Sequence, residues 1–445
     1  MEGLQSIFSG SNEATKLLQA LLPKIRSCQE DLNARCISRS LFGLKNMSST
    51  SPEVLLLLSA LTPSIQSCTE PFLPDDISSA FVGIRNMNSS AREVRVLLSE
   101  LAPKIDACTE PFSDKDISNC LYGLQRMSDK APEVLKILSV LVPKIQSCQR
   151  SFSAQAVGNA LYGLRNFNSR IPEVQALLAA LIPKIESCTK PLNAQEVGMA
   201  LNGLCCMSSR VPVVLKLLAA LAPKIISCEE DFNRTALSNA MYGLRNMRTY
   251  AAEVRLVLSA LIPKIDSCQQ SLLSFNVGSS LYGMSCMNSD CEEVLQVLSI
   301  LTPKIRASND KLQPADLSNA LYGLRHMRCD QKAVVELVSV LAEKAEASCG
   351  QQTFSSAEQV RVALEGIQNV LTSADHPAIA HLLTVLVSMI RSFPVKLSSR
   401  GIEPFLTHCQ ALAVGNKSNE MTMLIAALEE KIALSPPKKN LIKCF

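Results

Sequence analysis

The chain has 445 residues, of which 47% are hydrophobic and only 4% are aromatic, and it contains no Trp. This balance favours helices rich in Leu and Ala over β-sandwiches and barrels, which use many aromatic and β-branched residues. The 44 basic and 40 acidic residues leave a net charge of +4. A charge this small excludes a bulk field that would hold the whole molecule on nucleic acid, so any such binding has to come from local patterning.

Features that mark secreted or membrane proteins are not evident. No charged and then apolar leader follows Met1, and the apolar stretch from Ala378 to Ile390 is too short to span a bilayer. The 17 Cys residues suggest a disulfide framework only in a small secreted chain. We therefore expect a soluble protein in a reducing, intracellular compartment, which is the cytoplasm, or a mitochondrion or plastid if the N-terminus is truncated.

A repeat of 40 residues runs through the chain. A shift of that length superimposes the segments Leu-Tyr-Gly-Leu or Leu-Tyr-Gly-Met that begin at Leu121, Leu161, Leu281 and Leu321. Glycine recurs in the same register at Gly3, Gly43, Gly83, Gly123, Gly163, Gly203, Gly243, Gly283 and Gly323. A period of roughly 20 to 50 residues is the signature of a solenoid or a propeller.

The N-terminus falls inside one repeat. Met1 to Leu4 match the second half of the first helix of a unit, so the first unit lacks its helix start. We expect either a fragment of a longer array or an exposed end that meets a partner.

The unit that begins at Ser113 shows the spacing of its first helix, helix A. Ser113 is a predicted N-cap, Asp116 follows at the spacing of a capping box, and Phe112 precedes the cap as a hydrophobic staple. Steps of three and four residues then place one apolar stripe on Ile117, Cys120, Leu121, Leu124 and Met127. Two amphipathic helices per unit predict a stack of helical hairpins rather than a propeller.

The second helix, helix B, is predicted to begin at Pro132 and to bury Val134, Ile137, Leu138, Leu141 and Ile145. Pro143 removes one hydrogen bond near the end of this helix, so we expect a kink or a helix end there. Lys144, which also recurs, suits the negative end of the helix dipole.

After residue 345 the repeats become less similar in sequence. Residues 355–370 resemble helix A with Gly366 three residues out of register, residues 377–391 resemble helix B, and residues 402–413 and 419–434 resemble one more pair. We predict an array of about nine 40-residue helical-hairpin repeats over 1–350, divergent C-terminal helical capping repeats over 351–434, and a tail over 435–445.

Small residues on helix A predict how the stack curves. The residues equivalent to Ser118 are Ser or Gly in every copy, and those equivalent to Gly123 are always Gly. At 100° per residue these two positions fall on the two flanks of helix A, which face the helices A of the neighbouring repeats. Helices A can therefore approach closely, whereas helices B have no such pair of small residues and should lie further apart. A stack whose A layer is tighter than its B layer curves with helices A on the inside. We predict an all-α, right-handed α-solenoid of 40-residue helix-turn-helix repeats, with helix A lining the concave face.

The outward positions of helix A are the candidate binding residues. Tyr offers a ring for base stacking, Asn a paired donor and acceptor for a base edge, and Arg a partner for phosphate. The residues equivalent to Lys115 differ between repeats, as a code in which each repeat recognises one base requires. The candidates are Lys115, Asn119, Tyr122, Arg126, Gln155, Asn159, Tyr162, Arg165, Asn166, Asn239, Tyr242, Arg245, Asn246, Tyr282, Asn319, Tyr322, Arg325 and His326.

Structural roles compete with each of these assignments. The tyrosine rings could pack on the neighbouring unit, and Asn119 could bridge helices A through its amide. A mostly basic row beside the candidates, the arginine row, could be a solvated flank. It consists of Lys45, Arg85, Arg165, Arg245 and Arg325 and is interrupted by Gln125, Cys205 and Ser285. The periodic Cys residues from Cys28 to Cys268 are interpreted as small buried side chains, because thiolates on successive repeats stand too far apart to share one zinc.

No catalytic motif occurs in the sequence, so an enzyme is not expected, and neither is a metal, a cofactor or a small-molecule substrate. The four His residues match no metalloprotease helix, and the recurrent Gly lies inside a helix rather than in a phosphate-binding loop.

The segment from Asp116 to Leu124 and its copies at 156–164, 236–244 and 316–324 resemble the first helix of octotricopeptide repeats, and Ala131-Pro132-Glu133-Val134 resembles the start of their second helix. The resemblance covers residues 1 to about 345, and no RAP domain, which often ends these proteins, is recognised. It implies an α-solenoid that binds organellar transcripts and governs their stability, splicing or translation.

Two hypotheses about function follow. The first is sequence-selective binding of single-stranded RNA, with an organellar transcript as the implied partner and a role in RNA processing, stability or translation. The second is a protein-interaction scaffold of armadillo or HEAT type that grips an extended peptide or a protein partner. Binding to a membrane is expected in neither case.

Overall fold

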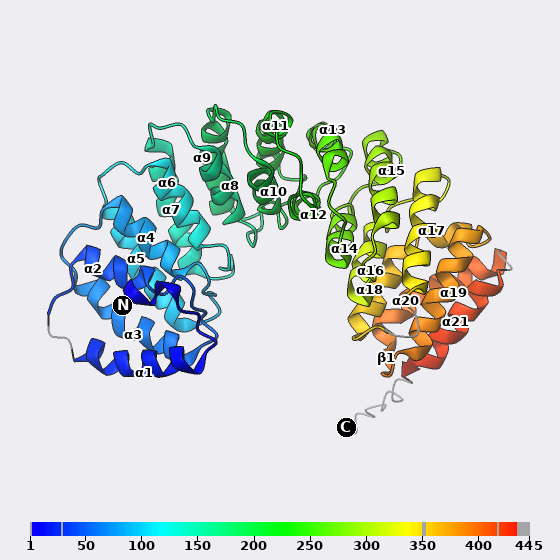
Figure 1. Cartoon of the computed structure of the whole chain (residues 1–445), viewed down its shortest axis with the longest axis horizontal. Coiled ribbons are helices and arrows are strands. Elements are labelled where there is room, and N and C mark those ends of the chain that lie inside the picture. Colours follow the sequence, from blue (N-terminus) through cyan, green and yellow to red (C-terminus); the bar gives the residue numbers. More distant parts are fainter. Residues whose placement is uncertain (1, 28–29, 349–352, 416–417, 434–445) are drawn as a thin grey trace, which may run out of the picture. The chain divides into compact units, whose positions relative to one another are not determined.

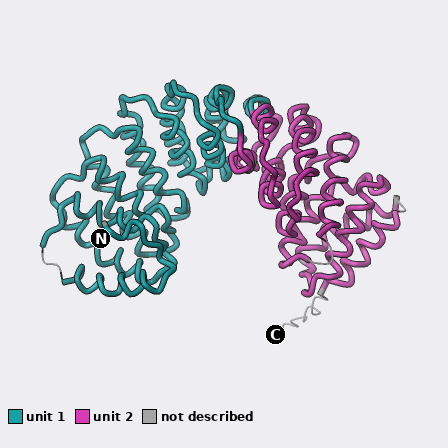
Figure 2. Tube along the Cα trace, in the orientation of Figure 1, with its two compact units in different colours: residues 1–231, 251–260 teal, residues 232–250, 261–445 magenta. Residues whose placement is uncertain are grey.

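The computed structural model describes residues 2–27, 30–348, 353–415 and 418–433. The chain divides into unit 1, residues 1–231 and 251–260, and unit 2, residues 232–250 and 261–445 (Figure 2). Apart from one pair of two-residue strands, the regular structure of the described residues is helical. The predicted all-α architecture of stacked helical hairpins is confirmed in both units.

Unit 1 begins with the 3-10 helix η1 (Glu2–Ser6) and α1 (Asn12–Arg26). Its helices A are α2 (Ala34–Phe42), α4 (Pro74–Ile84), α6 (Asp114–Gly123), α8 (Ala154–Tyr162) and α10 (Ala194–Asn202). Its helices B are α3 (Pro52–Ser67), α5 (Arg92–Ala107), α7 (Pro132–Ser147), α9 (Pro172–Glu186) and α11 (Pro212–Ile226).

Unit 2 repeats the same alternation. Its helices A are α12 (Arg234–Gly243), α14 (Ser274–Tyr282), α16 (Pro314–Gly323), α18 (Ala357–Ile367) and α20 (Ser399–Gly415). Its helices B are α15 (Glu292–Ala307), α17 (Lys332–Glu346), α19 (Pro377–Ser392) and α21 (Asn419–Lys431), and the end of α13 (Ala252–Ser267) belongs to it as well. The 3-10 helix η2 (Val370–Ser373) precedes α19, and β1 (Leu397–Ser398) pairs in parallel with β2 (Ile432–Ala433).

Each unit has two helical layers. In unit 2, α14, α16 and α18 lie side by side in one layer, and α15, α17 and α19 lie side by side in the other (Figure 1). The hydrophobic core lies between the layers. In the unit that begins at Ser113, the predicted stripes from Ile117 to Met127 and from Val134 to Ile145 have 0% of their surface exposed.

The predicted helix starts are confirmed at atomic detail. The Ser113 hydroxyl accepts a hydrogen bond from the backbone N–H of Asp116 (3.2 Å), and the Asp116 carboxylate accepts one from the Ser113 N–H (3.0 Å). This is the capping box that the sequence predicts. Asn193 and Glu196 form the same box at the start of α10, while at α8 the Ser153 hydroxyl alone caps the helix by accepting from the Ala156 N–H; the staple residue Phe112 is buried.

The recurrent glycines bring helices A into backbone contact. A Cβ atom on Gly163 would lie 2.0 Å from the Leu121 carbonyl oxygen of the preceding repeat, and one on Gly283 would lie 2.0 Å from that of Met241. On the other flank, a Cβ on Gly278 would lie 2.8 Å from the Asp316 Cα atom. Gly366, which is three residues out of register in the sequence, lies equally close to the Leu321 backbone. In the regular repeats of each unit, successive helices A pack more closely than successive helices B, as predicted, whereas the divergent helices α18 and α20 do not pack closely.

Helices A end earlier than predicted. Helix α6 stops at Gly123, and the chain continues through tight turns in which Leu124 N donates to Leu121 O (2.9 Å) and Met127 N to Leu124 O (2.8 Å). Glycine has low helix propensity, and bonds of this i to i+3 type tighten the last turn. Gln125 and Arg126 therefore lie on a turn beyond helix A.

Helices B do not end at the proline equivalent to Pro143, so the expected helix end is wrong. Helix α7 continues through Pro143 to Ser147. Both Pro143 and Ser139, whose carbonyl loses its partner, are exposed. Water can solvate that carbonyl, so the helix tolerates the missing bond.

The lysine after the proline neutralises a helix end, but not the end of its own helix. The Lys144 Nζ donates to Cys108 O (2.6 Å) and Asp106 O (3.1 Å), at the C-terminus of α5 in the preceding repeat. In unit 2, Lys304 does the same for Cys268 O and Asp266 O (both 2.9 Å). The lysine row therefore ties successive helices B together.

The divergent C-terminal helices also pair as predicted. Helices α18 and α19 match the predicted pair at 355–370 and 377–391, and α20 and α21 match the last pair. The predicted tail at 435–445 lies outside the described residues.

Candidate functional site

The tyrosines of helices A stack on one another within each unit. In unit 1 the ring centroids of Tyr122 and Tyr162 lie 6.0 Å apart. In unit 2, Tyr282 lies 5.9 Å from Tyr242 and 5.2 Å from Tyr322. Offset stacking contributes about 0.5–1.5 kcal/mol per pair beyond burial. The packing role considered for these rings is therefore observed, while their contact with RNA stays a prediction.

An arginine three residues further on covers several of these rings. The Arg165 guanidinium lies 4.9 Å from the Tyr162 centroid and donates a hydrogen bond to the Tyr162 hydroxyl. Arg245 covers Tyr242 at 4.6 Å, and Arg325 covers Tyr322 at 4.5 Å and also donates to the hydroxyl of its tyrosine. Part of the predicted arginine row is thus bound to the tyrosine row.

The asparagine candidates fall into two groups. Asn166 bridges repeats, because its Nδ2 donates to the Gln125 carbonyl (2.9 Å), and Asn239 and Asn246 also have interaction partners. In contrast, the half-buried side chains of Asn119, Asn159 and Asn319 make no hydrogen bond within the described parts of the chain. These three amides can bind an external partner. Lys115 and Gln155 lie exposed at the starts of their helices A.

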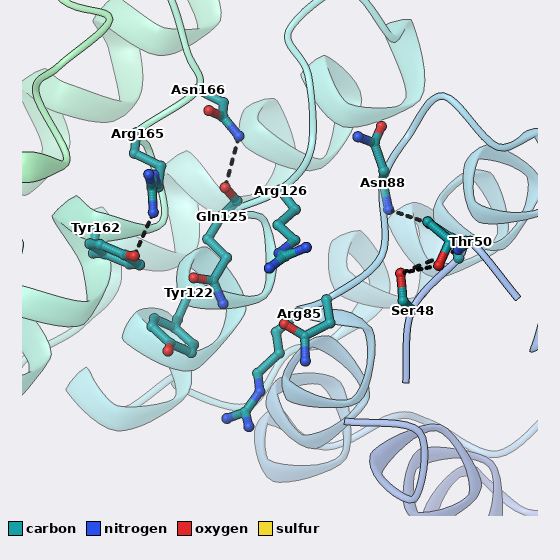
Figure 3. Close-up of a pocket in the computed structure, with 12 residues that line it drawn as sticks. Ser48, Thr50, Arg85, Asn88, Tyr122, Gln125, Arg126, Tyr162, Arg165 and Asn166 are labelled. Atoms are coloured by element: carbon teal, nitrogen blue, oxygen red, sulfur yellow. Dashed lines mark hydrogen bonds between the residues drawn. The ribbon is translucent and has the colours of Figure 1, made fainter. Parts of the chain in front are cut away.

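Five of the predicted residues line one cavity of unit 1, namely Tyr122, Arg126, Tyr162, Arg165 and Asn166 (Figure 3). The cavity has a volume of about 480 Å³, within the range of about 300–1,000 Å³ that is typical of ligand pockets. Its remaining wall comes from Gln125 and from the two preceding repeats, through Ser48, Ser49, Thr50, Arg85, Asn86 and Asn88.

The cavity is cationic. Three arginines and no carboxylate are among its lining residues. Arg85 is held in place by Lys45 O (3.2 Å) and Asn46 Oδ1 (3.0 Å), and Arg165 is held by Tyr162. The exposed Arg126 guanidinium makes no hydrogen bond or ion pair within the described residues. An anionic group in the cavity would meet a free guanidinium between two anchored ones.

The corresponding face of unit 2 has different electrostatics. A cavity of about 450 Å³ is lined by Arg325, His326, Glu365, Gln368, Asn369, Gly401, Pro404 and Phe405. His326 occupies the repeat position of Arg126. Desolvation, and then the positive charges of Arg325 and Arg248, lower the pKa of His326. The imidazole is thus neutral at pH 7, and this cavity includes a carboxylate.

Several lining residues were not among the predicted candidates. Arg85 belongs to the arginine row but is not one of the predicted binding residues, and Gln125 interrupts that row. Asn88 occupies the row of Ser128 and Asn168, on the turn after helix A. The repeat period aligns these positions, but it does not reveal which turn residues reach across two repeats.

The periodic cysteines have the structural role expected for them. Cys108, Cys148, Cys188, Cys228 and Cys268 are buried, while Cys28 lies outside the described residues. Burial raises the pKa of the Cys108 and Cys188 thiols, which favours their neutral form. In the part of the chain that the structure describes, no group of three or more His, Cys, Asp or Glu side chains could hold a metal ion.

Among the described residues, no helix is both long and apolar enough to cross a membrane.

No protein-family model matches the chain, and a search of curated proteins gives no match. Among solved structures, the chain is similar to one described as "Homology model of the full-length AP-3 complex in an intermediate open conformation". That match has 12% sequence identity and a TM-score of 0.33, and it covers 98% of this chain and 83% of the other. At this identity and TM-score, it carries no inference about function.

Proposed function

We propose that the helix A face of this helical-repeat protein binds single-stranded RNA, with the cavity of unit 1 as its main contact. The observation that carries the proposal is the lining of that cavity, which has three arginines, two tyrosines, several amides and no carboxylate. Guanidinium groups bind phosphate in bidentate geometry, while phenol rings and amides contact unpaired bases. A double helix would hide the base edges from these groups, so the ligand is single-stranded.

The free amides and the variable helix starts support a sequence-selective mode of binding. Asn119 and Asn159 offer unpaired donors and acceptors one repeat apart, beside exposed residues that differ between repeats, such as Lys115 and Gln155. A spacing of about one nucleotide per repeat would suit them, as in other helical-repeat RNA readers. With the resemblance to octotricopeptide repeats, this leads us to propose an organellar transcript as the ligand, and a role in its processing, stability or translation.

The test is a binding titration of the purified chain with a fluorescent, random-sequence RNA oligonucleotide. Affinity should fall steeply between about 50 and 200 mM salt, because phosphate contacts release counterions. Arg126→Gln should weaken binding and reduce the salt slope by about 0.7, the contribution of one phosphate contact to a single strand. Lys136→Gln is the matched control, because it removes the same charge from the exposed side of α7 in the helix B layer.

Two outcomes would overturn the proposal. One is wild-type protein that does not bind RNA at low salt. The other is equal weakening by Arg126→Gln and Lys136→Gln, which would indicate a diffuse charge effect. If an extended peptide bound the same face with no steep dependence on salt, the chain would be a protein-interaction scaffold instead.

A further inference from the structure

We infer that Tyr122 and Gln125 form a base-binding subsite in the unit 1 cavity, created by the interruption of the arginine row at position 125. The inference rests on the proposed function and names the place where one unpaired base is held. It begins with the residue three positions after each row tyrosine. That residue is Arg165, Arg245 or Arg325 in three repeats, but Gln125 after Tyr122 and Ser285 after Tyr282.

The arginine decides whether a tyrosine can contact a ligand. Over Tyr162, Tyr242 and Tyr322 the guanidinium lies 4.9, 4.6 and 4.5 Å from the ring centroid. In contrast, the Tyr122 ring has no cation over it, and the Tyr122 hydroxyl makes no hydrogen bond, as far as the described residues show. Gln125 therefore leaves Tyr122 uncovered.

Tyr282 also lacks the arginine, but other rings stack against it. It lies between Tyr242 and Tyr322, at 5.9 and 5.2 Å. Among the described residues Tyr122 stacks on Tyr162 alone, and the equivalent position in the preceding repeat is Val82, which has no ring. Tyr122 thus ends its stack, and it lines the cavity together with Gln125 and Arg126 (Figure 3).

These three side chains supply the groups that a nucleotide needs. A base can stack on the uncovered part of Tyr122, an interaction worth about 1–3 kcal/mol. The Gln125 side chain makes no hydrogen bond within the described residues, so its amide can donate to and accept from the edge of that base. The free Arg126 guanidinium, one residue further on, can bind the adjoining phosphate.

The decisive variant is Gln125→Arg, which installs the arginine that covers the tyrosine in sister repeats. Charge alone predicts tighter RNA binding for this variant, because it adds a cation to the cavity. Our inference predicts the opposite, a loss of about fivefold in affinity, because the new guanidinium covers Tyr122 and replaces the amide. Tyr122→Ala should lose about tenfold. Tyr250→Ala, at a tyrosine that is 62% exposed on a turn outside the row, is the control.

Ultraviolet crosslinking to RNA gives a second measurement. Mapping the crosslinked peptides should place a nucleotide on Tyr122 in the wild type and not in Gln125→Arg, and thermal melting should show that both chains are folded. If the wild type bound no RNA, the proposed function would fail. If it bound RNA and Gln125→Arg bound equally well or better, the subsite would fail while the proposed function stood.

Discussion

Units 1 and 2 share one repeat but differ in what their helix A faces can bind. In unit 2, Tyr242, Tyr282 and Tyr322 form a continuous stack, and arginines cover its two ends. In unit 1 the stack has two tyrosines, of which only Tyr162 is covered, and the cavity beside it contains no carboxylate. The residues that recur in each repeat therefore form the scaffold. Residues that differ from the repeat, such as Gln125 and Val82, leave the Tyr122 ring accessible to a ligand.

The largest expected effect tests what the two units have in common. Gly163→Ala in unit 1 and Gly283→Ala in unit 2 both place a Cβ 2.0 Å from a backbone carbonyl oxygen. Each should lower the free energy of unfolding by about 3 kcal/mol, because two backbones would have to separate. Chemical denaturation measures this value. Gly10→Ala is the control, because nothing lies within 4 Å of its Cβ.

Gly163 and Gly283 are C-cap residues with right-handed helical backbone angles, which alanine adopts without strain. At such positions alanine normally stabilises a protein relative to glycine by about 0.4–1 kcal/mol. The sign of the result therefore tests the assignment directly. Variants as stable as the parent would contradict the close approach of helices A.

The recurrent lysines of helices B make the same contacts in both units, and replacing them should have a smaller effect on stability. Lys144→Met in unit 1 and Lys304→Met in unit 2 each remove two hydrogen bonds to carbonyls at the end of the preceding helix B. We expect a loss of about 1 kcal/mol for each, since Met retains the apolar stem. Lys136→Met, on the exposed side of α7, should change stability by less than about 0.5 kcal/mol. A larger loss in the control would contradict the capping role.

Much of the fold could be predicted because its determinants are local. The capping box of Ser113 and Asp116 and the apolar stripe from Ile117 to Met127 act within one helix, and a period of 40 residues repeats them. The dipole role of Lys144 was predicted, but its partner, Cys108, is 36 residues earlier in the chain. Spacing within one helix cannot reveal that the lysine serves the preceding repeat.

The site was harder to predict for the same reason. Five candidates line the cavity, but Ser48 and Asn88 reach it from repeats that a single-helix projection does not include. The projection also extended helix A past Gly123, where the chain has already left the helix. Gln125 looked like a defect in a row of arginines, and only the covering of Tyr162 by Arg165 shows what the defect leaves open.

A third prediction concerns the charge difference between the units. Arg126→Gln in unit 1 should weaken RNA binding about threefold, while His326→Gln at the same repeat position in unit 2 should change it by less than about 1.5-fold at pH 7. The reason is that the lowered pKa of His326 leaves that position uncharged. Fluorescence titration at fixed salt measures both. Equal losses would mean that RNA contacts the two units alike.

The smallest effect concerns the pH dependence of His326 itself. Its pKa is lowered in the folded protein, whereas an unfolded chain takes up the proton near pH 6.5. As the pH falls below about 6.5, the unfolded state therefore binds a proton that the folded state still excludes, and stability decreases until the pH reaches the folded pKa. His326→Gln should remove this part of the acid sensitivity in denaturation curves at pH 7 and pH 5. An NMR titration that placed the His326 pKa at or above its ordinary value would contradict the assignment, because position 326 would then carry a charge similar to that of Arg126 under mildly acidic conditions.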